Sequence, residues 1–463
     1  MMKTLLLACY ELGHQPLSLA WPAAVLRQAG LDVIAVDLSV EEFPTEDAAT
    51  ADLVAVAAPM HTALRLGVEA ARRVRALNPQ AHVCFFGLYA WLNADYLLHS
   101  HNGDGPPLAD SVIAGEAEPV LRELALALAQ GASLSGLAGV TTRTHAATPH
   151  LARMRFPAPI RDGLPGLARY ARYMEDGVAH LAGYTEASRG CLHTCRHCPV
   201  VPIYRGRFFV VPVETVLADI AQQVEAGARH ITFGDPDFLN GPGHARRVAR
   251  ALHATFPQIS FDFTTKVEHI LEHPDLVAEL AKLGATFAIS AFESVSDHVL
   301  ARLDKGHTVA DMEAALAVVR RAGLAIQPTW VPFTPWTTLD DYLAMLTWIR
   351  RHGLIPATPA VQLSIRLLIP PGSALLDGPD VDAWLGPLEA ENFTYAWRHP
   401  DPRMDALQQQ VAAIAEAAGE DGDPQHAFRA VEEAAWTLAG LPLPPAEPVS
   451  GVAPPRLTEH WFC

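Results

Sequence analysis

Three cysteines lie close together in the middle of the chain. Cys191, Cys195 and Cys198 fall within eight residues, with the spacing C-x3-C-x2-C. Three thiolates on one short loop can each bind one iron of a [4Fe–4S] cube and leave the fourth iron without a protein ligand. The amine and carboxylate of an amino acid could chelate that open iron. The spacing therefore predicts an iron–sulfur cluster with one position open to a small molecule.

A zinc site is the alternative that the spacing leaves open. The same three thiolates and either His193 or His197 could surround one zinc ion. A disulfide framework fits poorly, because clustered thiols in a long chain without a secretory signal indicate metal binding or catalysis.

The position of the cysteines along the chain favours the cluster. They follow an expected strand over residues 181–185, and in this setting the loop resembles that of the radical S-adenosylmethionine (SAM) superfamily. The resemblance implies that the open iron binds SAM. It also implies that one electron, supplied by a donor such as flavodoxin or ferredoxin, cleaves a sulfur–carbon bond of SAM to give a carbon radical.

The composition limits the partners. The 463 residues carry 51 acidic and 34 basic side chains, a formal charge of −17, and half of the residues are apolar. Since no basic run stands out, nucleic acid is not an expected partner. No apolar run reaches the length of a membrane span, and the first run, residues 5–9, is too short for a signal. We expect a cytoplasmic protein that acts on a small molecule and does not bind membranes.

Four segments are expected, and together they predict an α/β protein. Residues 1–135 alternate strand and helix patterns, which predicts a doubly wound, Rossmann-like domain. Residues 136–178 are predicted to form a linker. In residues 179–375, six strand–helix units predict a partial (β/α)6 TIM barrel with its site at the carboxyl ends of the strands. Residues 376–463 are expected to form a small, mostly helical extension.

The first domain resembles the cobalamin-binding-type domain that precedes many radical SAM enzymes. The resemblance rests on residues 16–20, which open the first helix, and on residues 115–118 after the fifth strand. The D-x-H-x-x-G loop that supplies a histidine to cobalt is absent. His14 could replace that ligand, although a lone loop histidine is more often solvated. The resemblance supports the fold of the first domain, and these departures argue against cobalamin as a cofactor.

Two motifs in the barrel segment are candidates for SAM binding. Gly234 and Asp235 follow the second barrel strand, where radical SAM proteins place a small residue and a carboxylate that receives the SAM amino group. The alternative is that these residues only shape a turn. Glu293 opens an E-S-x-x-D-x-V-L-x-x-L-x-K-G run typical of several radical SAM families, and the resemblance implies that it contacts SAM. A buried structural carboxylate is the alternative there.

Two cations are expected at the same mouth of the barrel. Lys266 ends the third strand, and Arg366 lies in the expected sixth strand, residues 361–368. Arg366 would suit the SAM carboxylate through a bidentate pair. A slip of one residue in the register would turn it away.

The tail carries the most specific resemblance. Residues 198–202, 233–240, 331–338 and 461–463 resemble radical SAM proteins known for a Cys-Cys or Cys-Sec tail (the CUAEP/CCAEP tail), and these are related to the radical SAM enzyme of arsinothricin biosynthesis. That enzyme is thought to move the 3-amino-3-carboxypropyl group of SAM onto arsenic. The resemblance implies that Cys463 binds trivalent arsenic, with arsenite as substrate. We also hypothesise that a selenocysteine codon after Cys463 was read as a stop.

Other functions stay open at this point. The alternatives are a 5′-deoxyadenosyl-radical enzyme or a cobalamin-assisted methyltransferase, and a non-catalytic iron–sulfur or zinc protein that binds metalloids. Cys9 and Cys84 are expected to be core residues, because small buried cysteines in strands usually are.

Overall fold

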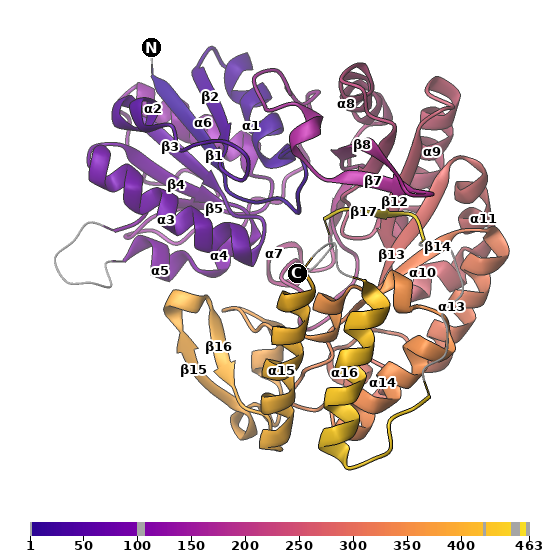
Figure 1. Ribbon diagram of the computed structural model, residues 1–463. Coiled ribbons are helices and arrows are strands. Elements are labelled where there is room, and N and C mark those ends of the chain that lie inside the picture. The colour runs from indigo at the N-terminus through magenta and orange to yellow at the C-terminus, as the bar shows by residue number, and fades with distance from the viewer. Residues whose placement is uncertain (1, 100–106, 420–422, 446–453, 460–463) are drawn as a thin grey trace.

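The fold is described by a computed structural model, which covers residues 2–99, 107–419, 423–445 and 454–459. It consists of a parallel sheet with helices on both faces, a curled sheet surrounded by helices, and a C-terminal extension that contacts both (Figure 1). The α/β architecture predicted from the sequence is confirmed. No helix in the described ranges is long and apolar enough to span a membrane.

The first sheet is formed by strands between residues 3 and 141, and this part of the chain is here called the N-terminal unit. Its strand order is β2-β1-β3-β4-β5-β6, and all neighbouring pairs are parallel except β5 with β6. The strands are β1 (Lys3–Ala8), β2 (Asp32–Asp37), β3 (Leu53–Ala57), β4 (His82–Phe86), β5 (Ser111–Ile113) and β6 (Val140–Thr141). The helices are α1 (Leu17–Gln28), α2 (Thr45–Thr50), α3 (His61–Leu77), α4 (Leu88–Leu92), α5 (Ala94–Leu98) and α6 (Ala117–Ala129).

Alternation along the strands divides the interior of this unit into two cores. Leu5 and Leu7 pack in the core that contains α3, whereas Leu6 and Ala8 pack in the core that contains α1 and α6. Successive side chains of a strand point to opposite faces, so a continuous apolar strand can hold helices on both.

The second sheet is the wall of the barrel, with the order β14-β13-β12-β11-β8-β7-β17. Pairs from β8 to β14 are parallel, and β7 and β17 are added antiparallel at one edge. The strands are β7 (Arg172–Glu175), β8 (Val178–Thr185), β11 (His230–Phe233), β12 (Ser260–Thr265), β13 (Ala285–Glu293), β14 (Ala325–Trp330) and β17 (Arg456–Leu457). The main helices are α8 (Val213–Glu225), α9 (Pro242–Thr255), α10 (Val267–Glu272), α11 (Pro274–Lys282), α12 (Asp297–Arg302), α13 (Val309–Ala322) and α14 (Leu339–Arg351).

Two of these helices begin at capping boxes. Thr308 before α13 and Thr338 before α14 each accept a hydrogen bond from the backbone N–H of an aspartate three residues later, and that aspartate bonds back to the threonine. The reciprocal bonds satisfy backbone donors that the first helical turn leaves unpaired.

The sixth barrel strand departs from the prediction. Residues 361–368 contain the end of a 3-10 helix, Ala360–Leu363, and one isolated parallel bridge between Phe333 and Arg366. The side chain of Gln362 accepts a hydrogen bond from the backbone N–H of Trp330. A side chain therefore satisfies a β14 donor that a sixth strand would have paired.

The predicted linker and extension both contain strands. Residues 136–178 include β6 and β7, with a 3-10 turn at Leu167–Arg169. The extension has a hairpin, β15 (Leu385–Glu389) and β16 (Thr394–Trp397), and two helices, α15 (Pro402–Ala418) and α16 (Pro424–Ala439). Phe393 of the hairpin packs edge-on against Tyr96 in a core of the N-terminal unit. The extension thus contacts the first sheet as well as the barrel.

Candidate active site

The loop with the three cysteines lies at the carboxyl end of β8. It is enclosed by a short antiparallel pair, β9 (Ser188–Gly190) and β10 (Phe208–Val210), and by α7 (Val201–Tyr204). Gly190 has φ +76°, and a Cβ there would lie 2.5 Å from the ring of Tyr204. The side-chain oxygen of Asn240 accepts from the N–H of Leu192 at 3.2 Å and lies 3.6 Å from the Cys191 sulfur. These contacts help to fix the conformation of the loop.

A buried ion pair lies beside the cysteine loop. Lys305 Nζ donates to Glu293 Oε1 at 3.1 Å, and Nε2 of His197, a loop residue, lies 3.5 Å from the same oxygen. Burial acts to raise the pKa of Glu293, but Lys305 and His197 outweigh it and lower that pKa to about 2. Glu293 is therefore an anion held by two cationic or polar groups.

The backbone of Glu293 is strained. Its φ of +64° is rare for a residue with a side chain, and the register between β13 and β14 shifts at this position. Such strain persists only where the surroundings enforce it, and it concentrates at functional sites. The register shift directs the carboxylate toward the cysteine loop.

The three thiols fit an iron–sulfur cluster. They are soft sulfur ligands on one loop. Burial acts to lower the pKa of Lys305, but Glu293 and then Cys195 and Cys198 outweigh it and raise that pKa, so the ammonium lies close to these sulfurs. A buried cation next to three thiolates offsets negative charge that a cluster would bring. Cys191, Cys195 and Cys198 are the residues that would hold the cluster.

Gly234 and Asp235 lie next to the cysteine loop, but they make internal contacts. A Cβ at Gly234 would lie 2.0 Å from the Tyr184 hydroxyl oxygen, so only glycine leaves room for that ring. Asp235 accepts from the Ala187 N–H at 2.9 Å and from the Ser188 hydroxyl at 2.6 Å. Burial raises the pKa of Asp235 to about 7, against the effect of these bonds. In this structure Asp235 anchors the approach to the cysteine loop, and its bond to SAM stays a prediction.

Lys266 faces the cysteine loop through a chain of hydrogen bonds. Its ammonium pairs with Glu268 and lies 3.1 Å from His193 Nδ1. His193 Nε2 lies 3.3 Å from His269 Nε2. The other ring nitrogen of His269 lies 2.9 Å from an oxygen of the buried Asp237.

His193, Asp237 and His269 also lie close enough to one another to form a metal site, with one ligand atom from each within 4.8 Å of the others. The Lys266 ammonium only donates, so the Nδ1 of His193 beside it is an acceptor. The Nε2 of the same ring is left facing His269.

The predicted orientation of Arg366 is wrong. Its guanidinium donates to Asp405 at 2.7 Å and to the carbonyl oxygen of Trp397 at 2.6 Å, and it stacks 3.5 Å from the centre of the Trp397 ring. Because the expected sixth strand does not form, Arg366 is directed at the extension. The other predicted catalytic residue, Cys463, lies outside the described residues.

Arg189 connects the cysteine loop to the N-terminal unit. Sequence reasoning did not identify this residue. Arg189 donates to Glu116, Glu118 and Glu186, and it stacks 4.2 Å from the centre of the Trp21 ring. Only its place two residues before Cys191 could have drawn attention to it. The side chain is 14% exposed, so these bonds are shielded from solvent.

The loop after β1 contains His14, the residue considered as a cobalt ligand. His14 is buried and stacked on Tyr184, with ring centres 4.5 Å apart. Burial lowers the pKa of His14 to about 3. The expectation of a solvated histidine is therefore wrong, and cobalt ligation by His14 stays a prediction. Cys9 and Cys84 are buried core residues, as expected.

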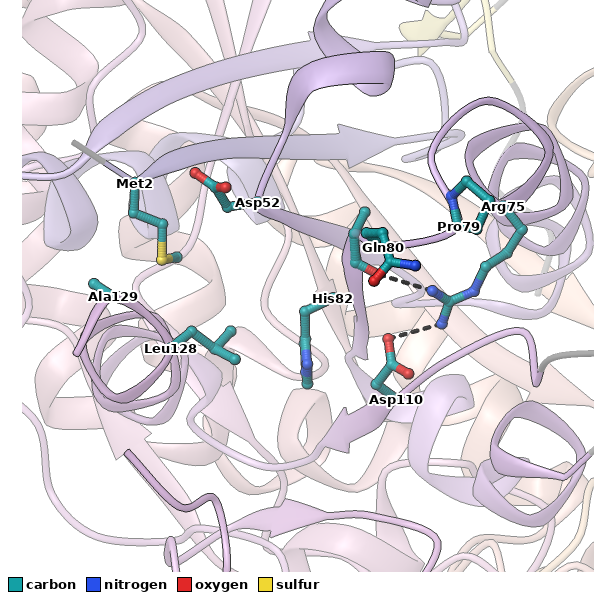
Figure 2. A pocket seen from close by; sticks show the side chains of 10 residues that line it. Met2, Asp52, Arg75, Pro79, Gln80, His82, Asp110, Leu128 and Ala129 are labelled. Atoms are coloured by element: carbon teal, nitrogen blue, oxygen red, sulfur yellow. Dashed lines mark hydrogen bonds and ion pairs between the residues drawn. The ribbon is translucent and has the colours of Figure 1, made fainter. Parts of the chain in front are cut away.

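A cavity of about 700 Å³ lies at the amino ends of the strands of the first sheet, beside the start of β4 (Figure 2). Arg75 there bonds to Asp110 at 2.7 Å and to the carbonyl oxygen of Ala81 at 2.8 Å, and His82 bonds to Ser111 at 2.9 Å. Ligands of doubly wound sheets bind at the carboxyl ends of the strands. This cavity is at the amino ends and its charged groups are paired, so it is not the candidate site.

Comparison with known proteins agrees with the barrel site. Residues 185–346 match the model of the Radical SAM superfamily. The chain is 24% identical over 351 residues to an uncharacterized methyltransferase of Pyrococcus horikoshii, which covers 73% of each protein. It is 24% identical to the hopanoid C-3 methylase of Methylococcus capsulatus over 70% of this chain and 62% of that protein.

A solved structure extends the likeness to nearly the whole chain. The cobalamin-dependent SAM radical enzyme OxsB, with aqua-cobalamin bound, aligns with a TM-score of 0.71 over 94% of this chain and 72% of its own, at 15% identity. At that identity the likeness shows the fold alone. The superfamily match over residues 185–346 and the two relatives show an enzyme that is similar to the radical SAM superfamily. In particular, the chain shares its fold with this cobalamin-dependent SAM radical enzyme, and its sequence is similar to that of a methyltransferase.

Proposed function

We propose that this enzyme cleaves SAM reductively and transfers its 3-amino-3-carboxypropyl group to trivalent arsenic supplied as arsenite. The observation that carries SAM cleavage is the three-cysteine loop beside the buried Glu293–Lys305 pair, within the segment that matches the Radical SAM superfamily. The resemblance of residues 461–463 to thiol-bearing tails supports the transferred group and the acceptor. Reduced thiols suit the cytoplasm.

The residues of the chain would divide the work. Cys191, Cys195 and Cys198 would hold the cluster, which supplies one electron to SAM when it is bound. Lys305 and Glu293 fix the charge beside the loop, and Lys266 offers a cation to the SAM carboxylate in place of Arg366. Gly234 and Asp235 would border the SAM amino group. Cys463 would bind arsenic through its sulfur.

The proposed reaction balances with two electrons. The first electron breaks the bond between sulfur and the aminocarboxypropyl carbon, which releases 5′-methylthioadenosine and a carbon radical. The radical forms a carbon–arsenic bond with arsenite. A second electron and one proton return arsenic to the trivalent state and release one water. A low-potential one-electron donor, such as flavodoxin or ferredoxin, must supply both electrons.

Anaerobic incubation with SAM, a reductant and arsenite tests the proposal by the nucleoside formed. 5′-Methylthioadenosine together with an arsenic–carbon product is the expected result. 5′-Deoxyadenosine as the sole nucleoside would contradict it. Cys463→Ser should keep nucleoside release and lose the arsenic product.

Cobalamin-assisted methylation is the second candidate function. The similarity to OxsB and to the hopanoid methylase favours it, and the packed His14 weighs against it. A cobalamin absorption spectrum on the purified protein, with S-adenosylhomocysteine among the products, would replace the first proposal with this one.

A further inference from the structure

The cysteine loop reaches the surface of the molecule beside a second turn of the chain. Within residues 191–198, Leu192 and Thr194 are exposed, and Leu192 is 46% exposed although it is apolar. A Cβ at Gly206 would lie 3.4 Å from the Leu192 carbonyl oxygen and 4.0 Å from a side-chain carbon of Thr194. The turn formed by residues 205–207 therefore lies directly against the exposed part of the loop.

Three arginines surround this part of the loop, and they are here called the arginine patch. Arg205 and Arg207 are exposed on the turn, and Arg247 is exposed on α9. Arg207 comes directly before β10, whose first residue pairs with the last residue of β9. Because the cysteine loop begins where β9 ends, Arg207 lies beside the start of that loop.

The start of α9 brings Arg247 to the same surface. A Cβ at Gly241, just before the helix, would lie 3.2 Å from the ring of Phe208 on β10. A Cβ at Gly243 would lie 3.8 Å from the guanidinium of Arg247, so this side chain lies at the N-terminal end of α9. The first turn of α9 carries no acidic residue, and a helix N-terminus adds positive partial charge.

The arginine patch is not neutralised by carboxylates. Residues 187–213 contain four arginines and neither aspartate nor glutamate, although the whole chain has 51 acidic residues and a formal charge of −17. Within the described ranges, none of the three patch arginines takes part in an ion pair. By contrast, Arg246 and Arg250 of the same helix both pair with Glu279. The patch is thus a local positive surface on an acidic protein.

We propose that the arginine patch and Leu192 form the docking surface for an acidic one-electron carrier protein of the flavodoxin class. This inference rests on the proposed function, because reductive cleavage of SAM needs electrons from outside the chain. In each transfer the reduced carrier loses one electron and the cluster on the three cysteines gains it, and no atom moves between the two proteins.

An exposed apolar residue with a charged rim suits a brief electron-transfer contact. Interfaces of this kind are small, and complementary charge mainly speeds the encounter of the two proteins. Leu192 directly follows Cys191, so a carrier seated on it comes close to the thiols. The net negative charge of the chain repels an acidic carrier, and the arginine patch would direct that carrier to the cysteine loop.

Charge reversal tests the docking surface in the holoenzyme. Arg207→Glu/Arg247→Glu should weaken binding of flavodoxin about tenfold or more, as measured by anaerobic surface plasmon resonance. The rate of cluster reduction by reduced flavodoxin should fall with it, whereas SAM cleavage driven by titanium(III) citrate should stay at the wild-type rate. Arg321→Glu is the control, because it makes the same charge change at an exposed arginine of α13 and should leave binding within about twofold.

The dependence on salt gives an independent measure. Flavodoxin binding to the wild type should weaken as the ionic strength rises from about 10 to 150 mM, and this dependence should be smaller in Arg207→Glu/Arg247→Glu. Arg247→Glu alone leaves the cysteine loop and its neighbouring turn intact, so it should keep the wild-type iron content and weaken binding about threefold. This single variant decides the question if the double variant loses iron.

Two results would overturn the docking surface. One is a wild-type holoenzyme that does not bind flavodoxin. The other is wild-type affinity, salt dependence and cluster reduction in both variants. If titanium(III) citrate drives no SAM cleavage even in the wild type, the proposed function fails. The binding and cluster-reduction measurements would still decide where the carrier docks.

Discussion

The carboxyl ends of the two parallel sheets carry polar groups that are used in opposite ways. At the first sheet, Glu116 and Glu118 bond outward to Arg189 and Tyr204 and hold the cysteine loop from outside. At the barrel, Glu293 and Lys305 bond to each other beside the thiols. Parallel strand ends therefore support the cysteine loop in one sheet and line the candidate site in the other, depending on what lies opposite them.

Glycines mark the same contrast. A Cβ at Gly115, after β5, would lie 2.2 Å from the His150 carbonyl oxygen, so backbone covers the strand end of the first sheet. At the barrel, Gly234 instead makes room for the ring of Tyr184. One edge is closed by main chain, and the other is lined by side chains.

Removing a thiol should produce the largest difference between the two sheets. Cys195→Ala should lower SAM cleavage more than about 1,000-fold, because a cluster with two thiolates loses its site. Cys84→Ala, in the core of the first sheet, should leave cleavage within about twofold, with only a modest loss of stability. Iron content and nucleoside release measure both. Equal losses in the two variants would contradict the assignment.

Breaking the Glu293–Lys305 ion pair of the barrel should have the next largest effect. Lys305→Met leaves a buried carboxylate without its partner and should cost about 3–5 kcal/mol of unfolding free energy. The double variant Lys305→Met/Glu293→Gln should recover much of that loss. Urea unfolding under anaerobic conditions checks this. If the double variant is no more stable than Lys305→Met, the unpaired Glu293 carboxylate is not the cause of the lost stability.

A smaller effect is expected at the first sheet. Glu118→Gln weakens a charge-assisted bond to Arg189 and should cost about 1–2 kcal/mol. Glu123→Gln, on the same helix, alters an exposed pair with Arg122 and should cost less than about 0.5 kcal/mol. Thermal unfolding separates the two. If Glu118→Gln also abolishes iron binding, the Glu118–Arg189 bond is required for the cluster site and is not only a support of the loop.

His14 should make the contact between the two sheets sensitive to acid. Burial lowers its pKa from 6.5 to about 3 in the folded protein, so the unfolded chain takes up its proton first. The stabilisation is present above pH 6.5 and is lost as the pH falls toward 3, by roughly 1 kcal/mol for each pH unit. His14→Phe, which keeps the ring stacked on Tyr184, should flatten this slope in unfolding experiments between pH 7 and 5. An unchanged slope would rule His14 out as its source.

The smallest effect is expected at Arg366. Arg366→Ala removes a partly exposed pair and a stacked contact with the extension, which costs about 1 kcal/mol or less. SAM affinity, measured by equilibrium dialysis, should stay within about twofold. A tenfold weaker affinity would restore the original prediction that this arginine binds SAM.

The sequence by itself determined most parallel strands and helices of the two sheets and the thiol loop, but not the loss of the sixth barrel strand or the strands in the linker and extension. Apolar strands that alternate with amphipathic helices predict both parallel sheets, since periodicity and helix caps are local properties. The spacing of Cys191, Cys195 and Cys198 is local too. A strained Glu293 could not be read from the sequence, because a residue with a side chain gives no sign of positive φ.

Only the tertiary structure decided which polar groups meet. Gln362 bonds to the backbone of β14 in place of a sixth strand, and Arg366 pairs with Asp405 of the extension. Arg189 binds two carboxylates about 70 residues away, and β17 pairs with β7 across nearly 300 residues. Such contacts depend on how whole elements pack, and no local pattern encodes them. The sequence thus determined which chemistry is available, and the packing decided where it is assembled.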